Sequence, residues 1–259
     1  MQSVFVANLP WTRYNELVSA GQTCLLIPVG ALEQHGPHMA MNADVLIPTA
    51  ICERIAHKIG ALVAPAIAYG YKSQQKSGGG NHLPGTTSLD GNTLSLTVRD
   101  ILREFARHGV RKIVLVNGHY ENSMFLVEGV DLALRELKWG GIGDFYVVLL
   151  SYWDFVSEEA IRSVYPDGFP GWAVEHGGVL ETSLMLELYP DLVDMKCAVD
   201  HPPATFPPYD FFPIKPEWTP PSGTLSSPKR ASAEKGRLLL EVCVSGISKA
   251  MTVAFQAKR

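Results

Sequence analysis

The sequence predicts an α/β fold of three layers, α/β/α, with a mainly parallel central sheet and an active site at the carboxyl ends of the strands. Short continuous apolar runs are typical of strands that are buried on both faces. Segments with helical spacing of apolar residues alternate with these runs, which favours parallel strands joined by helices. The strand–helix unit does not recur often enough for a closed barrel of such units, so an open sheet is predicted.

The first half of the chain contains two predicted strands and a helix between them. "TCLLIPVG" (23–30) is an apolar run that Gly30 closes, and the segment 45–60 has helical spacing up to Gly60. "ALVAPAIAYG" (61–70) is predicted as the second strand. The polar, glycine-rich stretch after it, "YKSQQKSGGGNHLPGTTSLDG", is predicted as a long loop.

The second half continues the alternation. Residues 92–109 place Leu94, Val98 and Leu102 on one side of an amphipathic helix. The remaining predicted elements are a strand at 112–118, a helix at 122–137, a strand at 145–153, a helix over "GGVLETSLMLELYP" and a long C-terminal helix over "SAEKGRLLLEVCVSGISKAMTVAF". Because there is no internal repeat and no clear linker, residues 1–259 are predicted to form one domain.

Residues 202–228 interrupt this pattern with a proline-rich stretch, "PPATFPPYDFFPIKPEWTPPSGTLSSP". Proline cannot continue a helix or a central strand, so this arm is predicted to be an extended surface segment. Loops of this length are uncommon in compact domains. The arm either covers the site or a partner subunit, or it is a plain surface segment, and the sequence leaves these alternatives open.

Composition restricts the expected partners and compartment. A net charge of -4 and a pI near 6.1 provide no basic surface, which argues against nucleic acid and anionic membranes as partners. No apolar run approaches the roughly 18 residues that span a bilayer, and the N-terminus lacks the pattern of a signal peptide. The cysteines form no CxxC pair, so reduced thiols in a cytoplasmic protein are expected; they are Cys24, Cys52, Cys197 and Cys243.

Polar and aromatic side chains gather where the predicted strands end. In an open parallel sheet, ligands bind outside the carboxyl ends of the strands. The residues at these ends are Glu33, His35 and Asp44 after the first strand, His119, Tyr120 and Glu121 after the third, and Trp153 after the fourth, followed by Trp172, Glu175, His176 and Glu181. Histidines and carboxylates that recur at separate strand ends predict a functional site.

Spacing narrows the chemistry of this site. Glu33-x-His35 and His119-x-Glu121 each alternate across one residue, which in an extended segment directs both side chains to one face. With Asp44 they supply nitrogen and oxygen ligands without sulfur, a set that suits Zn²⁺ or Mn²⁺. This set exceeds what one catalytic zinc ion takes. Two metals bridged by Asp44 and sharing a hydroxide are therefore predicted, an arrangement that suits hydrolysis of an amide or ester-like bond.

Other residues have simpler interpretations. A single Glu-x-His pair also occurs by chance in polar loops, and only the combination of two pairs favours a metal. His38 is interpreted as a loop residue outside the site. Trp153 and Trp172 fit either core aromatics or the wall of a substrate pocket. The histidines expected on the surface are His57, His82 and His108.

Several segments resemble the creatininase family: "VGALEQHGPH", "YKSQQKSGGGNHLPGTTSLDG", "NGHYENS", "LSYWDF", "EHGGVLETSLML" and "DHPPATFPPYD". The resemblance extends over nearly the whole chain. It implies reversible hydrolysis of the ring amide of creatinine to creatine, with zinc as the expected metal and manganese able to occupy one site. The implied ligands are Glu33, Asp44 and His119 for one metal and His35, Asp44 and Glu121 for the other.

The resemblance also implies roles around the metals. His176 carries the proton to the ring nitrogen, and Trp153 and Trp172 enclose the flat substrate, with Trp172 on a loop that closes over it. Contacts to the substrate or to the metal ligands are expected from Ser77, Tyr120, Glu175 and Glu181. Ala173 stands where an acidic residue is expected, and the family implies a homohexamer. A different small amide as substrate, or a binding protein without catalysis, are the alternatives.

Overall fold

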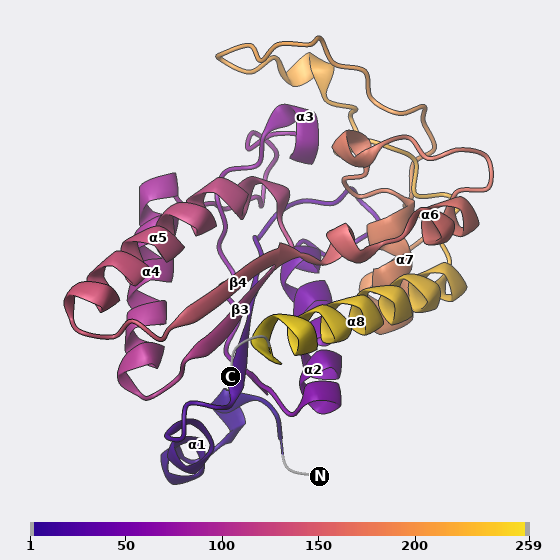
Figure 1. Cartoon of the computed structure of the whole chain (residues 1–259). Helices are drawn as coiled ribbons and strands as arrows, with labels where there is room; N and C mark the ends of the chain where they lie inside the picture. Colours follow the sequence, from indigo (N-terminus) through magenta and orange to yellow (C-terminus); the bar gives the residue numbers. More distant parts are fainter. Residues whose placement is uncertain (1–2, 257–259) are drawn as a thin grey trace.

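The computed structural model describes residues 3–256 and confirms the predicted fold class (Figure 1). Within these residues the sheet consists of the parallel strands β1 (Cys24–Val29), β2 (Leu62–Val63), β3 (Lys112–Asn117) and β4 (Tyr146–Ser151). They lie in the order β2-β1-β3-β4, so β1 and β3 are the central strands. Because all pairs are parallel, the carboxyl ends of the strands meet at one edge of the sheet.

Helices cover both faces of this sheet (Figure 1). One face carries α4 (Gly91–Arg107) and α5 (Ser123–Trp139), and the other carries α2 (Ala43–Ile59), α7 (Val179–Leu188) and α8 (Ala233–Gln256). In β1, Leu25 and Ile27 belong to the core under α4 and α5, whereas Leu26 belongs to the core under the other helices. Successive strand residues point to opposite faces, so a strand covered on both faces is apolar throughout.

Shorter elements complete the described chain. They are the helices α1 (Trp11–Val18), α3 (Gln75–Gly78) and α6 (Glu158–Val164) and the 3-10 turns η1 (Val6–Asn8), η2 (Tyr120–Asn122), η3 (Tyr152–Phe155), η4 (Trp172–Val174), η5 (Pro190–Leu192) and η6 (Pro216–Trp218). Neither α1 nor α6 is among the predicted elements, because so few turns show little periodicity. The assignment of residues 1–259 to one domain stays a prediction.

The predicted strand at 61–70 is wrong in extent. β2 forms a ladder with β1 over only two residues, and the chain returns to β1 at an isolated bridge between Ile67 and Val29. Pro65 lies between these contacts and has no backbone N–H to donate to a neighbouring strand. An apolar run interrupted by proline therefore forms an edge strand in two pieces.

Helix α2 begins at Ala43, earlier than the predicted helix at 45–60. Asp44 therefore lies in the first helical turn, where the helix dipole stabilises a negative charge. Pro48 has no N–H to donate to the Asp44 carbonyl, and Gly30 and Gly118 lie against that carbonyl from the ends of β1 and β3. Asp44 is thus held where the two central strands end.

This close packing leaves no room for a methyl group at Gly30. An ideal Cβ there would lie 2.3 Å from the Asp44 carbonyl oxygen. Gly30→Ala is therefore expected to lower the free energy of unfolding by about 1–3 kcal/mol, measured by chemical denaturation. Gly143→Ala is the control, since an added methyl there meets nothing within 4 Å. Equal stability of the Gly30 variant and the wild type would contradict the packing.

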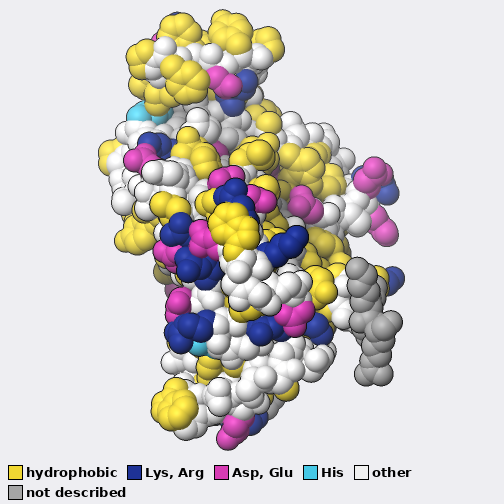
Figure 2. Space-filling view, turned by 60° about the vertical axis from the view of Figure 1, so that its left-hand side comes forward, with side chains coloured by type: hydrophobic (Ala, Val, Ile, Leu, Met, Phe, Trp, Pro, Cys, Tyr) yellow, Lys and Arg dark blue, Asp and Glu magenta, His cyan; other side chains and the backbone are white. Residues whose placement is uncertain are grey.

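The proline-rich arm (202–228) forms the top of the molecule in Figure 1 and is irregular apart from η6, as predicted. A hydrogen bond from Ala204 N to Leu225 O closes its base. Near its tip, Asp210 pairs with Lys76 of α3 at 3.4 Å. Hydrophobic side chains gather on the tip (Figure 2), and the exposed aromatic residues there are Tyr209, Phe211 and Phe212.

Helix α8 is long and apolar enough to cross a membrane by length and composition alone, with a mean hydropathy of 1.6 over its most apolar window. In the structure, Leu239, Cys243 and Ile247 of this helix are fully buried. Together they pack against α7 and α2 in the core on that face of the sheet. These apolar residues of α8 therefore belong to the core, and 39% of its most apolar window is buried.

Candidate metal centre

A cluster of buried polar side chains lies at the carboxyl edge of the sheet. Glu33 and His35 follow β1, Asp44 lies in the first turn of α2, and His119 follows β3. Each of the four is at most 3% exposed. The packing of β1 beside β3 therefore brings these predicted ligands together in the interior, although they come from segments that are far apart in the sequence.

Asp44 faces two histidines with its two carboxylate oxygens. Its Oδ1 lies 3.0 Å from His35 Nε2, and its Oδ2 lies 3.1 Å from His119 Nδ1. Glu33 Oε2 lies 3.0 Å from the same nitrogen of His119. Two groups of donor atoms therefore share Asp44: one includes Glu33 and His119, and the other includes His35 and Glu181.

Several atoms of this cluster have no hydrogen-bond partner within the described residues 3–256. They are Glu33 Oε1, His35 Nε2 and Asp44 Oδ2, and all three are buried. A buried polar atom without a partner costs about 1–3 kcal/mol, so native interiors keep few of them. Carboxylate and imidazole donors that converge in this way fit divalent ions such as Zn²⁺ or Mn²⁺.

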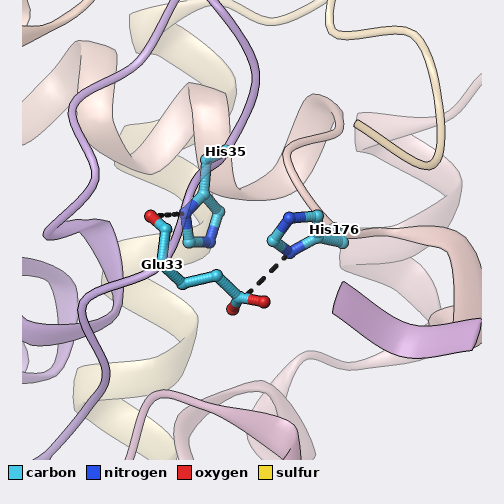
Figure 3. A group of neighbouring side chains, drawn as sticks. All are labelled: Glu33, His35 and His176. Atoms are coloured by element: carbon cyan, nitrogen blue, oxygen red, sulfur yellow. Dashed lines mark hydrogen bonds and ion pairs between the residues drawn. The ribbon is translucent and has the colours of Figure 1, made fainter. Parts of the chain in front are cut away.

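Backbone carbonyls determine which ring nitrogen of each histidine faces the cluster. His35 Nδ1 lies 3.1 Å from the Glu33 carbonyl oxygen (Figure 3). His119 Nε2 lies 3.0 Å from the Tyr71 carbonyl oxygen. A carbonyl oxygen can only accept, so these nitrogens carry the hydrogen and the other ring nitrogens face the cluster. Metal-binding histidines are oriented in this way by partners outside the metal site.

The charges of the cluster shift the pKa values of its own members. Burial opposes protonation of His35, but the carboxylates of Asp44 and Glu181 outweigh it and raise the pKa of His35 to about 10. Burial raises the pKa of Glu33 to about 7. The cluster thus takes up protons in the absence of metal, and binding of a divalent ion would release them.

Glu121 lies at the edge of the cluster and belongs to neither group of donors that shares Asp44. Its Oε1 accepts hydrogen bonds from Ser77 Oγ at 2.6 Å and Gln74 N at 2.9 Å, and its Oε2 lies 3.4 Å from His119 Nε2. The expectation that His119 and Glu121 share one face of an extended segment is wrong, because the chain turns into η2 directly after His119.

Glu181 belongs to the second group of donors, with His35 and Asp44, whereas the sequence predicts only a contact to the substrate or to the metal ligands. It stands in the first turn of α7, and its Oε2 lies 3.7 Å from His35 Nε2. The same oxygen accepts a hydrogen bond from Gly177 N at 2.7 Å. Burial raises the pKa of Glu181 to about 7. Two carboxylates, Glu121 and Glu181, are therefore candidates for the third ligand beside His35 and Asp44.

A cavity of about 610 Å³ opens above the cluster. Trp153 and Trp172 line it, and Trp172 is half-exposed and packs edge-on against Phe169 with ring centroids 5.0 Å apart. Every residue predicted to contact the substrate is in its wall, namely Ser77, Tyr120, Trp153, Trp172, Glu175, His176 and Glu181. Ala173 of η4 lines it as well, and so does Asp210 of the arm. The residues predicted to contact the substrate thus share one cavity.

Glu175 and His176 are neighbours in the chain with different surroundings. The Glu175 carboxylate accepts hydrogen bonds from Leu180 N in the first turn of α7 and from Ser226 Oγ at 3.5 Å, so it is placed to hold the start of that helix. His176 faces the cluster instead, with Nδ1 3.9 Å from Glu33 Oε2 (Figure 3). Burial lowers the pKa of His176 well below its ordinary value, so the imidazole is neutral.

Comparison with known proteins assigns the chain to a family. The model of the creatininase family, described as creatinine amidohydrolase, matches residues 7–251. The chain belongs to the creatininase family. A creatinine amidohydrolase of Pseudomonas putida is 68% identical over 255 residues, and the match covers 98% of both chains.

Solved structures of the creatininase family match the fold over its whole length. A crystal structure of creatinine amidohydrolase (creatininase) has a TM-score of 0.98 and 66% identity, with 100% of both chains covered. A mutant creatininase complexed with creatine has a TM-score of 0.96 and 67% identity, covering 98% of this chain and 99% of that chain. The resemblance noted in the sequence motifs is confirmed by these matches.

The remaining histidines named from the sequence lie outside the cluster. His38 is buried, and its Nε2 lies 2.9 Å from Thr182 Oγ1; it is a core histidine rather than a plain loop residue. His57 and His82 are exposed, as predicted, whereas His108 is partly buried against Tyr14. The sequence motifs do not single out Gln34, whose only signal is its position between Glu33 and His35.

Proposed function

We propose that this chain hydrolyses the ring amide of creatinine to creatine, reversibly, with two divalent metal ions. The observation that carries the proposal is Asp44, whose two oxygens face two separate groups of donors beneath an aromatic-walled cavity. The close relative from Pseudomonas putida is a creatinine amidohydrolase, and a matched creatininase binds creatine. The cavity and donor set of this chain, together with its similarity to these proteins, support the same substrate here.

Zinc is the proposed metal, with manganese able to occupy one site. Two of the matched creatininase structures are a Glu→Gln mutant of the Zn–Zn type and a manganese form. Glu33, Asp44 and His119 would hold one ion, and His35, Asp44 and Glu121 the other. When bound, such ions activate water and polarise the carbonyl group of an amide.

The residues around the metals bind the substrate and handle the proton. Trp153 and Trp172 offer aromatic side chains to a flat ring that carries a guanidino group, and Phe169 packs edge-on against Trp172. His176 is the histidine of the cavity wall that is outside the proposed ligand set, and it is the proposed partner of the leaving ring nitrogen. Ser77 orients Glu121 by its hydrogen bond at 2.6 Å, and Tyr120 lines the mouth of the cavity.

The function is tested by incubating the zinc-loaded protein with creatinine and measuring creatine formation. Turnover of creatinine well above that of other small cyclic amides is the expected result. Efficient hydrolysis of another amide, with no action on creatinine, would move the chain to a different activity within the family. A protein that binds metal but hydrolyses none of these compounds would support the alternative of a binding protein.

The third ligand beside His35 and Asp44 is tested by a pair of matched variants. Glu121→Gln is expected to weaken binding of the second ion by at least the roughly 10–100-fold that loss of a supporting partner costs, whereas Glu181→Gln keeps both ions. Metal content is measured by elemental analysis after dialysis. The reverse result would assign the ligand role to Glu181, which lies 3.7 Å from His35.

We further propose that the chain forms a homo-oligomer, a hexamer as the family resemblance implies, in the cytoplasm. The exposed aromatic tip of the arm supports assembly, because such patches mark contact surfaces. The four cysteines are free thiols, which supports a reducing compartment. A monomeric mass by light scattering would contradict the assembly. Recovery of the activity outside the cytoplasmic fraction would contradict the compartment.

A further inference from the structure

Gln34 is a buried amide that contacts His176 directly. Its Nε2 lies 3.0 Å from His176 Nε2, 2.9 Å from the Gly223 carbonyl oxygen and 3.4 Å from the Gly78 carbonyl oxygen. Its Oε1 accepts a hydrogen bond from Gly36 N at 2.9 Å. A flipped amide would set oxygen against two carbonyl oxygens and an NH₂ group against an N–H. The backbone around Gln34 therefore fixes the amide with its nitrogen toward His176.

This orientation determines the protonation pattern of the His176 ring. An amide NH₂ group donates hydrogen bonds and has no lone pair to accept one. His176 Nε2 must therefore be the unprotonated nitrogen, and the single ring proton of a neutral imidazole is on Nδ1. Nδ1 is the atom that faces the donor cluster, 3.9 Å from Glu33 Oε2 (Figure 3).

The end of the proline-rich arm holds both Gln34 and His176. Gly223 offers its carbonyl to the Gln34 amide, and Leu225 N donates to the His176 carbonyl oxygen at 2.9 Å. Gly223 has φ +81, and an ideal Cβ on it would lie 2.1 Å from Gln34 Oε1, so only glycine fits this approach. Residues 223–225 thus form a strap that holds the ring through Gln34 and the backbone through Leu225.

We propose that Gln34 is a positioning residue for His176: it orients the imidazole, keeps Nε2 unprotonated and presents the Nδ1–H group to the substrate. The kinetic part of this proposal rests on the proposed function, whereas the protonation pattern does not. The strap at 223–225 maintains this orientation, because Gly223 fixes the Gln34 amide and Leu225 fixes the His176 backbone.

The test is ¹⁵N NMR of the zinc-loaded, histidine-labelled protein, with the His176 signals assigned by their loss in His176→Asn. Long-range couplings distinguish a protonated Nδ1 from a protonated Nε2, so once the signals are assigned the tautomer is read from the wild-type spectrum itself. The expected wild-type pattern has the proton on Nδ1. In Gln34→Met, which keeps the size but not the donor, the other tautomer is expected to appear. For creatinine, kcat is expected to fall by about 10–100-fold with little change in KM.

The matched control is Gln75→Met. Gln75 is another buried glutamine that ties α3 to the arm through the Lys215 carbonyl oxygen and Thr219 Oγ1, without contact to His176. It is expected to leave the tautomer of His176 unchanged. A wild-type ring protonated on Nε2, or a Gln34→Met protein with wild-type tautomer and kcat, would overturn the proposal. An absence of creatinine turnover in the wild type would overturn only the proposed function, because the NMR pattern is read without substrate.

Discussion

Asp44→Ala is expected to lose both metal ions, because each oxygen of this carboxylate faces a different histidine. Loss of a partner outside a metal site already costs roughly 10–100-fold in affinity, and Asp44 would be lost as a direct ligand of both ions. Metal content after dialysis should fall to near zero. Creatinine turnover should be abolished with it.

The control for this variant is Asp131→Ala, which removes an exposed carboxylate of α5. It is expected to keep both metals and full activity. Retention of one ion in Asp44→Ala would show that Asp44 serves a single site rather than a bridge. Retention of both ions would mean that the buried cluster is not the metal centre. Each outcome is read from elemental analysis and does not depend on turnover.

His176→Ala is expected to keep the metals and to lose most of its activity. A positioned histidine in proton transfer contributes about 10²–10⁴-fold to rate, so kcat should fall within that range. The metal content should stay at the wild-type value, because Glu33, Asp44 and the two ligand histidines remain. Steady-state kinetics and elemental analysis on the same preparation separate the two effects.

His57→Ala is the matched control, since His57 is exposed near the end of α2 and far along that helix from Asp44. Its kinetics should equal those of the wild type. A His176→Ala enzyme with wild-type kcat would remove His176 from the reaction. A variant that loses metal as well would instead place His176 among the ligands, a possibility raised by its grouping with Glu33 and His35.

The fold class could be predicted because the features that define its strands and helices, apolar runs and terminal glycines, are visible in the local sequence. Each central strand is buried on both faces and therefore reads as a continuous apolar run. Gly30 and Gly60 mark the ends of their elements in the sequence itself. The extent of the second strand is mispredicted, because the ladder with β1 stops at Val63, before Pro65, and only a single bridge at Ile67 follows the proline. Local composition therefore predicts the elements better than their pairing.

The residues of the site also differ in whether the local sequence predicts their positions. Glu33, His35 and His119 could be predicted because parallel strands bring their carboxyl ends to one edge. The position of Glu121 could not, since the turn η2 replaces the extended backbone that the spacing assumed. Gln34 and Gly223 lie far apart in the sequence, and only packing shows that they touch. Contacts between distant loops leave no periodic trace in the sequence.

The closed base of the arm separates a segment whose sequence can vary, between Ala204 and Gly223, from the strap at 223–225, whose sequence cannot. Ala204 and Leu225 are joined by a hydrogen bond, and the strap at 223–225 lies directly beside that closure. The entropy of closing a loop grows so slowly that doubling its length costs only about 0.6 kcal/mol. Loop exchange between Ala204 and Gly223 could therefore change the outer surface of the tip and the part of the cavity wall that Asp210 forms, while the hydrogen bonds at 223–225 that hold His176 stay in place. The arm has an exchangeable tip on a base that is hydrogen-bonded to Gln34 and His176.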